Sequence, residues 1–143
     1  TLIRSMADDG RTGMGCTTRL VDSPRCIEVR YFGEVTPADL VTALDAAFAL
    51  AREEDLWFIL ADTSELTSDP SVFALYDVAA QIADAGIARR YREAVVAPPG
   101  AASADSARFF EDATVNRGLI ARVFGDRDAA ESWLCEQARG LSA

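Results

Sequence analysis

Three polar residues, Asp62, Thr63 and Ser64, directly follow a continuous apolar run at residues 56–61. Such a run is typical of a central strand that is buried on both faces. In open α/β sheets, ligands bind at the edge formed by the carboxyl ends of the strands, so these side chains are candidate ligand contacts. The same three residues could instead form a strand-to-helix turn, in which Asp and Ser side chains bond to the backbone.

Two serines, Ser68 and Ser71, flank the predicted start of the next helix. A phosphate on either serine would face free backbone N–H groups at the positive end of the helix dipole. Asp69 and Asp62 would repel that phosphate. Capping is the alternative function, with Asp69 as the N-cap residue and Pro70 at the first helical position.

A further candidate is Arg117, within the segment Asn116-Arg117-Gly118. The glycine predicts a helix C-cap in which Gly118 adopts the left-handed conformation. The Arg117 side chain could then reach the last carbonyl groups of the helix or Glu111. A contact with a ligand is the other interpretation.

Aromatic residues near the C-terminus could line a hydrophobic ligand cavity or form ordinary core. They are Phe109, Phe110, Phe124 and Trp133.

The composition excludes several chemistries. The chain has no His, and all 14 of its basic residues are Arg. Without His it lacks the usual general base and the Ser-His and Cys-His nucleophile pairs. Without Lys it lacks the P-loop lysine and Schiff-base chemistry. Its three cysteines have no metal-ligand spacing, and scattered thiols in odd number favour a reducing cytoplasm. We therefore expect no enzyme, no metal and no cofactor.

The net charge and the hydropathy limit the classes of binding partner that we expect. The net charge of −9 disfavours nucleic acid and anionic membrane surfaces, which need a basic face. No run approaches the ~20 apolar residues that a membrane span requires. We therefore expect a cytoplasmic protein that binds neither nucleic acid nor membranes.

The elements that must position these residues alternate along the chain. Residues 1–15 are polar and Gly-rich, which predicts a flexible segment, and residues 16–143 are predicted to form one domain. Strands are predicted at 16–22, 26–32, 56–61, 91–97 and 119–124, with helices starting near residues 36, 69, 103 and 126. The order ββαβαβαβα predicts an α/β fold. The first two strands form a hairpin, and the rest of the mixed sheet of about five strands is mostly parallel.

This order resembles the STAS domain family, and its SpoIIAA-like (STAS/Sec14-like) branch in particular, over residues 17–135. The residues that carry the resemblance are Phe32-Gly33, Thr36-Pro37, Leu60-Ala61-Asp62, Phe109-Phe110-Glu111, Asn116-Arg117-Gly118, Val123-Phe124, Ala129-Ala130 and Trp133-Leu134. The resemblance implies a non-enzymatic regulatory domain that binds a partner protein through residues 62–76. It also implies Ser71 as the phosphorylated serine, although Pro70 stands where the family has Asp.

The resemblance leaves a second function open. The Sec14-like comparison implies a binder of a lipid or apolar small molecule, in a cavity beneath the second and third predicted helices. A cavity of roughly 300 Å³ or more would mark such a binder. A homodimer also stays open.

Overall fold

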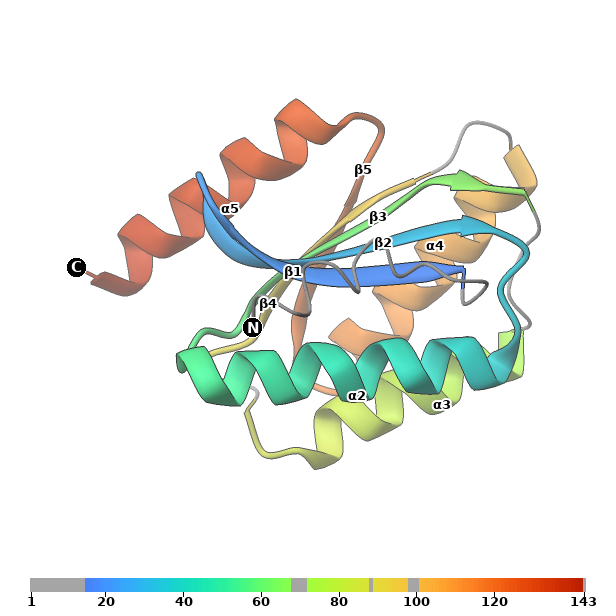
Figure 1. The fold of residues 1–143 in the computed structure, drawn as a ribbon, viewed down its shortest axis with the longest axis horizontal. Coiled ribbons are helices and arrows are strands. Elements are labelled where there is room, and N and C mark those ends of the chain that lie inside the picture. The colour runs from blue at the N-terminus through green and yellow to red at the C-terminus, as the bar shows by residue number, and fades with distance from the viewer. Residues whose placement is uncertain (1–14, 68–71, 88, 98–100, 143) are drawn as a thin grey trace.

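The computed structural model describes residues 15–67, 72–87, 89–97 and 101–142. Within these residues the chain forms five strands and four helices in the predicted order (Figure 1). The strands are β1 (Cys16–Asp22), β2 (Arg25–Gly33), β3 (Phe58–Leu66), β4 (Arg92–Val96) and β5 (Ile120–Phe124). The helices are α2 (Pro37–Glu54), α3 (Val72–Asp84), α4 (Ala101–Val115) and α5 (Arg127–Ser142). No helix in this part of the chain is long and apolar enough to cross a membrane.

The five strands form one sheet in the order β1-β2-β3-β4-β5. β1 and β2 pair as an antiparallel hairpin, and the other neighbouring pairs are parallel. The predicted α/β class, the hairpin and the mostly parallel sheet are therefore confirmed.

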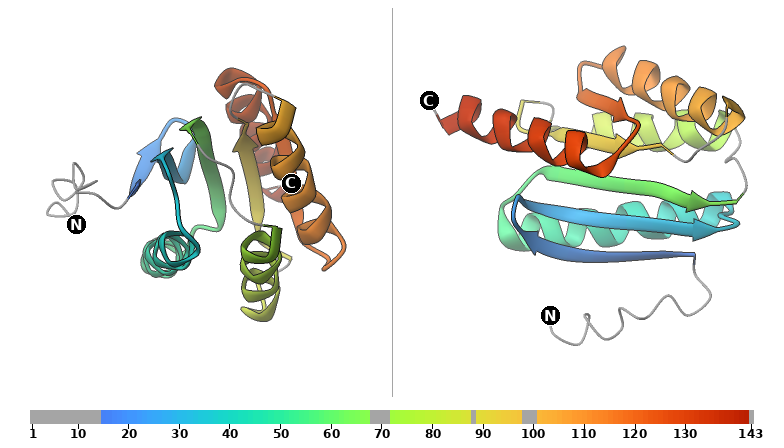
Figure 2. Two further views of the ribbon diagram at one scale, coloured as in Figure 1. Left: turned by 90° about the vertical axis from the view of Figure 1, so that its right-hand side faces the viewer. Right: turned by 90° about the horizontal axis from the view of Figure 1, so that it is seen from above.

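The helices are divided between the two faces of the sheet. α2 and α3 lie on one face, with α4 packed beside α3 near β5, and α5 lies on the opposite face (Figures 1 and 2). Two separate clusters of buried apolar side chains result. The larger lies under α2, α3 and α4, and the smaller joins α5 to the sheet through Leu60, Ala94 and Leu134.

β3 is longer than its apolar run. The sequence predicted a strand over residues 56–61, but β3 continues to Leu66. Arg30 of β2 pairs with Asp62, and Phe32 pairs with Glu65, so β3 carries one extra residue at this point. This irregularity is a β-bulge, which allows polar residues to continue a strand beyond its apolar part. Asp62, Thr63 and Ser64 therefore lie inside a strand and do not form the predicted turn.

Local signals fix the helix ends as the sequence predicted. The Thr36 hydroxyl accepts a hydrogen bond from the Asp39 N–H, and the Asp39 carboxylate accepts one from the Thr36 N–H. This reciprocal capping box, with Pro37 in the first turn, starts α2. Gly118 has a φ angle of 84° directly after α4, which is the left-handed conformation predicted for this position.

Candidate functional site

A cavity of about 90 Å³ lies between the sheet and the layer formed by α2, α3 and α4. Strands β2, β3 and β4 form its floor. Apolar side chains from the sheet and all three helices line it, among them Val29, Ile59, Val95, Leu40, Ile82 and Phe110. The cavity is therefore apolar over most of its surface.

Four of the described lining residues carry polar side chains: Tyr31, Thr63, Tyr91 and Glu93. Glu93 is only 6% exposed, and its Oε1 accepts a 2.5 Å hydrogen bond from the Tyr91 hydroxyl. Burial raises the pKa of Glu93 to about 7, and the Tyr91 hydrogen bond only partly opposes this. Burial and the nearby Glu93 charge raise the pKa values of both Tyr31 and Tyr91, so both phenols keep their protons.

Thr63 adds a second polar contact at the cavity. Its hydroxyl donates a 2.6 Å hydrogen bond to the Val96 carbonyl oxygen on the neighbouring strand β4. The hydroxyl proton is therefore engaged, and only the oxygen remains to accept a hydrogen bond from an occupant.

The opposite face of the sheet holds a network of ion pairs centred on Arg127, the first residue of α5. Arg127 Nη2 lies 2.5 Å from Glu28 Oε2, Nη1 lies 3.2 Å from Asp62 Oδ2, and Nε lies 2.7 Å from Glu131 Oε2. The contact with Oε2 of Glu28 is a close charge contact without the geometry of a hydrogen bond. The other oxygen of Glu28 accepts a 2.6 Å bond from Arg19. Two arginines thus neutralise Glu28, which is 0% exposed.

Asp62 connects this network to β3. Its Oδ1 accepts hydrogen bonds from the Ser64 N–H at 3.0 Å and from the Ser64 hydroxyl at 2.6 Å. Burial alone would raise the pKa of Asp62. The two Ser64 bonds and the Arg127 charge outweigh burial, so the pKa of Asp62 lies below its ordinary value. The local Asp-Ser bonding that the sequence predicted for a turn is present, but within a strand.

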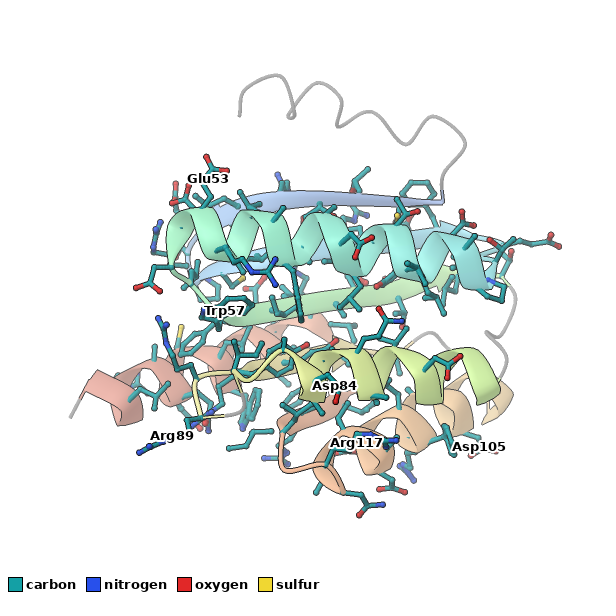
Figure 3. All side chains as sticks on the ribbon, turned by 90° about the horizontal axis from the view of Figure 1, so that it is seen from below. Glu53, Trp57, Asp84, Arg89, Asp105 and Arg117 are labelled. Carbon is teal, nitrogen blue, oxygen red and sulfur yellow. The ribbon has the colours of Figure 1, made fainter. Side chains whose placement is uncertain are left out.

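The structure separates the candidate residues of the sequence analysis. Asp62 and Ser64 belong to the Arg127 network, while Thr63 lines the cavity on the other face. Arg117 donates to the Ala113 carbonyl oxygen at the end of α4, as the capping interpretation predicted. It lies before β5, near α4 (Figure 3), at the edge of the sheet opposite the carboxyl end of β3. Ser68 and Ser71 lie outside the described residues.

The four aromatic residues do not form one cavity. Phe110 lines the cavity under α2, α3 and α4. Phe124 and Trp133 pack against each other on the α5 face, with ring centroids 5.7 Å apart. Phe109 is partly buried against the larger cluster. The four residues do not share one cavity because α4, which carries Phe109 and Phe110, and α5, which carries Trp133, cover opposite faces of the sheet.

Sequence reasoning missed the residues that give both regions their chemistry. Glu28 stands within a strand between the apolar residues Ile27 and Val29. Glu93 lies in β4, and Tyr91 and Glu93 have the two-residue spacing that places side chains on one face of a strand. That spacing was the available signal for the Tyr91–Glu93 pair. Arg127 carried no comparable signal for its contacts with Glu28 and Asp62, because these two partners are distant in the chain.

Among the described residues, no cluster of three or more acidic or Cys side chains could hold a metal ion. Burial, as the main cause, raises the pKa of the Cys26 thiol to about 12 and also raises the pKa of Cys16. Neither thiol is therefore an activated nucleophile at neutral pH.

Comparison with known proteins identifies the fold. No protein-family model and no curated protein matches the sequence. A crystal structure from Shewanella loihica PV-4, of an uncharacterized protein from the DUF3478 family with a SpoIIAA-like fold, does match. The TM-score is 0.53, and the two chains are 17% identical over 84% of this chain and 92% of the other. The chain therefore has the SpoIIAA-like α/β fold that the sequence predicted.

Proposed function

We propose that this protein is a non-enzymatic domain that binds a small, mainly apolar molecule in the cavity under α2, α3 and α4. The observation that carries the proposal is the cavity itself, with its apolar lining and its buried Tyr91–Glu93 pair. Binding sites commonly combine an apolar surface with a few polar groups that orient the ligand. A close-packed core would leave no such space.

The volume narrows the class of ligand. At about 90 Å³ the cavity is smaller than the roughly 300 Å³ expected for a lipid or drug-sized ligand. A cavity of about 150 Å³ engineered into another protein takes up benzene. A molecule of about five non-hydrogen atoms is therefore the better fit, and we do not propose a lipid ligand.

Two features support a role without catalysis. The chain has no His or Lys, and the thiols of Cys16 and Cys26 have raised pKa values. The other buried carboxylates among the described residues, Glu28 and Asp62, form ion pairs with arginines.

Regulation through a partner protein at residues 62–76 stays a prediction, since that surface includes residues outside the described part of the chain.

Titration with isobutanol, followed by two-dimensional NMR, tests the proposal. We expect saturable shifts confined to residues that line the cavity, such as Ala43, Ala61 and Ile82. Ala43→Leu fills the cavity from α2 and should abolish these shifts. Ala46→Leu makes the same change at an exposed position of α2 and should preserve them. Shifts that are absent, or that persist unchanged in Ala43→Leu, would contradict the proposal.

A further inference from the structure

The Glu93 carboxyl group lies inside the apolar cavity, and no cation of the described residues lines the cavity beside it. Its hydrogen bond comes from Tyr91, a neutral phenol, and none of the described residues that line the cavity is an arginine. The sequence offers no Lys or His that could take this place. A buried carboxylate is costly unless a positive charge or several hydrogen bonds compensate it. An occupant of the cavity can supply that charge.

Two further polar groups of the lining, the hydroxyls of Tyr91 and Thr63, also require donors from an occupant, whereas Tyr31 keeps a phenolic proton that it can donate. The Tyr91 proton is given to Glu93, and the Thr63 proton is given to Val96. Both hydroxyl oxygens can therefore only accept further hydrogen bonds, as can the Glu93 carboxylate. An ammonium group carries three N–H donors and a positive charge, and it has no acceptor. It complements this lining better than a hydroxyl or a carbonyl group does.

From this geometry, and resting on the function proposed above, we propose that the cavity binds a small aliphatic primary amine in its protonated form. The ammonium group pairs with Glu93, and the hydrocarbon part fills the apolar space between Val29, Ile59 and Phe110. The cavity volume limits the hydrocarbon part to about four carbons, by comparison with larger cavities that admit benzene.

The proposal follows from the different treatment of two buried carboxylates. Glu28 and Glu93 both lie within strands and are both shielded from solvent. Glu28 has the guanidinium groups of Arg19 and Arg127 within 2.6 Å. Glu93 faces a cavity instead. An arginine lies beside Glu28, whereas cavity space lies beside Glu93. A cationic ligand in that space would take the role that the arginine has at Glu28.

Isobutylamine and isobutanol are matched probes, because both have five non-hydrogen atoms and differ only in the polar group. Calorimetric titration at pH 8 should show that isobutylamine binds at least tenfold more tightly than isobutanol. Glu93→Gln keeps the shape of the side chain and an acceptor for Tyr91. It should weaken isobutylamine binding at least tenfold and change isobutanol binding less than twofold.

The acidic protein could also attract amines to its surface, so a second variant is needed. Glu53→Gln removes one negative charge at an exposed position of α2 that points outward (Figure 3). We expect it to leave isobutylamine binding within twofold of the original protein. Circular dichroism of both variants establishes that each is folded before titration.

The outcomes separate the two proposals. Equal binding of amine and alcohol, or an equal loss of amine binding in Glu93→Gln and Glu53→Gln, would overturn the amine proposal while the cavity remained a binding site. Failure of both probes to bind would overturn the proposed function as well.

Discussion

The two faces of the sheet treat buried carboxylates in opposite ways. On the α5 face, the carboxyl groups of Glu28 and Asp62 are held by Arg127, whose side chain is 31% exposed. On the face under α2, α3 and α4, Glu93 has a phenol as its partner and a pKa of about 7. The first arrangement fixes α5 to two strands. The second leaves a polar group whose charge depends on pH and on what fills the cavity.

This difference suggests a division of roles. Charges that satisfy one another leave little for a ligand to gain, so we regard the Arg127 network as structural. Among the described residues Glu93 has no cationic partner, so a ligand in the apolar cavity can gain an interaction that these residues do not provide. The comparison between the two faces can be tested by substituting residues of the Arg127 network and residues of the cavity separately.

Removing Arg127 should have the largest effect on stability. Arg127→Met keeps the apolar stem but leaves Glu28 with only Arg19 and leaves Asp62 with only Ser64. Breaking a buried ion pair from one side typically costs about 3–5 kcal/mol of unfolding free energy. We expect a loss of about that size in urea denaturation. Arg139→Met, at an exposed position of the same helix, should change the unfolding free energy by less than about 0.5 kcal/mol. A similar small effect at Arg127 would refute the structural role.

Glu93 should respond to pH in the opposite direction from a salt-bridged carboxylate. Its pKa is raised from 4.5 to about 7 in the folded protein, so between these values the folded state holds a proton that the unfolded state has lost. Raising the pH through this range should therefore lower the unfolding free energy of the protein, by about 3 kcal/mol in total. Glu93→Gln has no such proton and should become more stable than the original protein at pH 8.

The control for this experiment lies on the other face. The pKa of Asp62 is lowered, so its contribution is present above its ordinary pKa of 3.8 and is lost as the pH falls. Asp62→Asn should therefore flatten the stability curve below about pH 4 and leave the slope between pH 4.5 and 7 unchanged. The slope between pH 4.5 and 7 should instead disappear in Glu93→Gln. If it disappeared in Asp62→Asn and remained in Glu93→Gln, the titration in this range would not belong to Glu93.

The order of elements could be predicted from the sequence because its signals are local. Thr36-Pro37 and Gly118 mark helix ends, and the apolar run at 56–61 marks a central strand. The sequence also predicted the strand that forms β2. It did not reveal that Cys26 and Glu28 are buried there, because α5, about 100 residues later, covers that face of the sheet. The fold was therefore predictable, while the pairing of Glu28 with Arg127 was not.

The sequence did not show which residues of the candidate site lie together, for a related reason. Asp62, Thr63 and Ser64 are neighbours in the sequence, but in a strand consecutive side chains point to opposite faces. The prediction treated them as one turn, so it joined residues that the sheet separates. The cavity depends on contacts among three strands and three helices, and one sequence does not show which of these surfaces meet.

Filling the cavity should cost less than overpacking a closed part of the same helix. Ala43 and Ala51 are both buried on α2, but only Ala43 lines the cavity. Ala51→Leu inserts three carbon atoms into packed core and should lower the unfolding free energy by about 1–3 kcal/mol. Ala43→Leu should cost about 2 kcal/mol less than Ala51→Leu, because its added atoms enter existing space. Equal costs, measured by urea denaturation, would show that the space under α2 does not accept added atoms.

The smallest expected effects come from Ser64 and Thr63, which are adjacent in β3 but serve different faces. Ser64→Ala removes the hydroxyl bond to Asp62 and should lower the unfolding free energy by about 1 kcal/mol at pH 7. The cost should shrink as the pH falls below 3.8, the ordinary pKa of an Asp, because protonation of Asp62 weakens the bond in the original protein. Thr63→Val removes the bond to Val96 at a similar cost that does not vary with pH in this range.

In the NMR titration with isobutanol, Thr63→Val should shift the binding curve and Ser64→Ala should not, because of these two residues only Thr63 lines the cavity. If Ser64→Ala moved the curve as much as Thr63→Val, the two faces would be coupled through β3, and the division between a structural face and a binding face would fail.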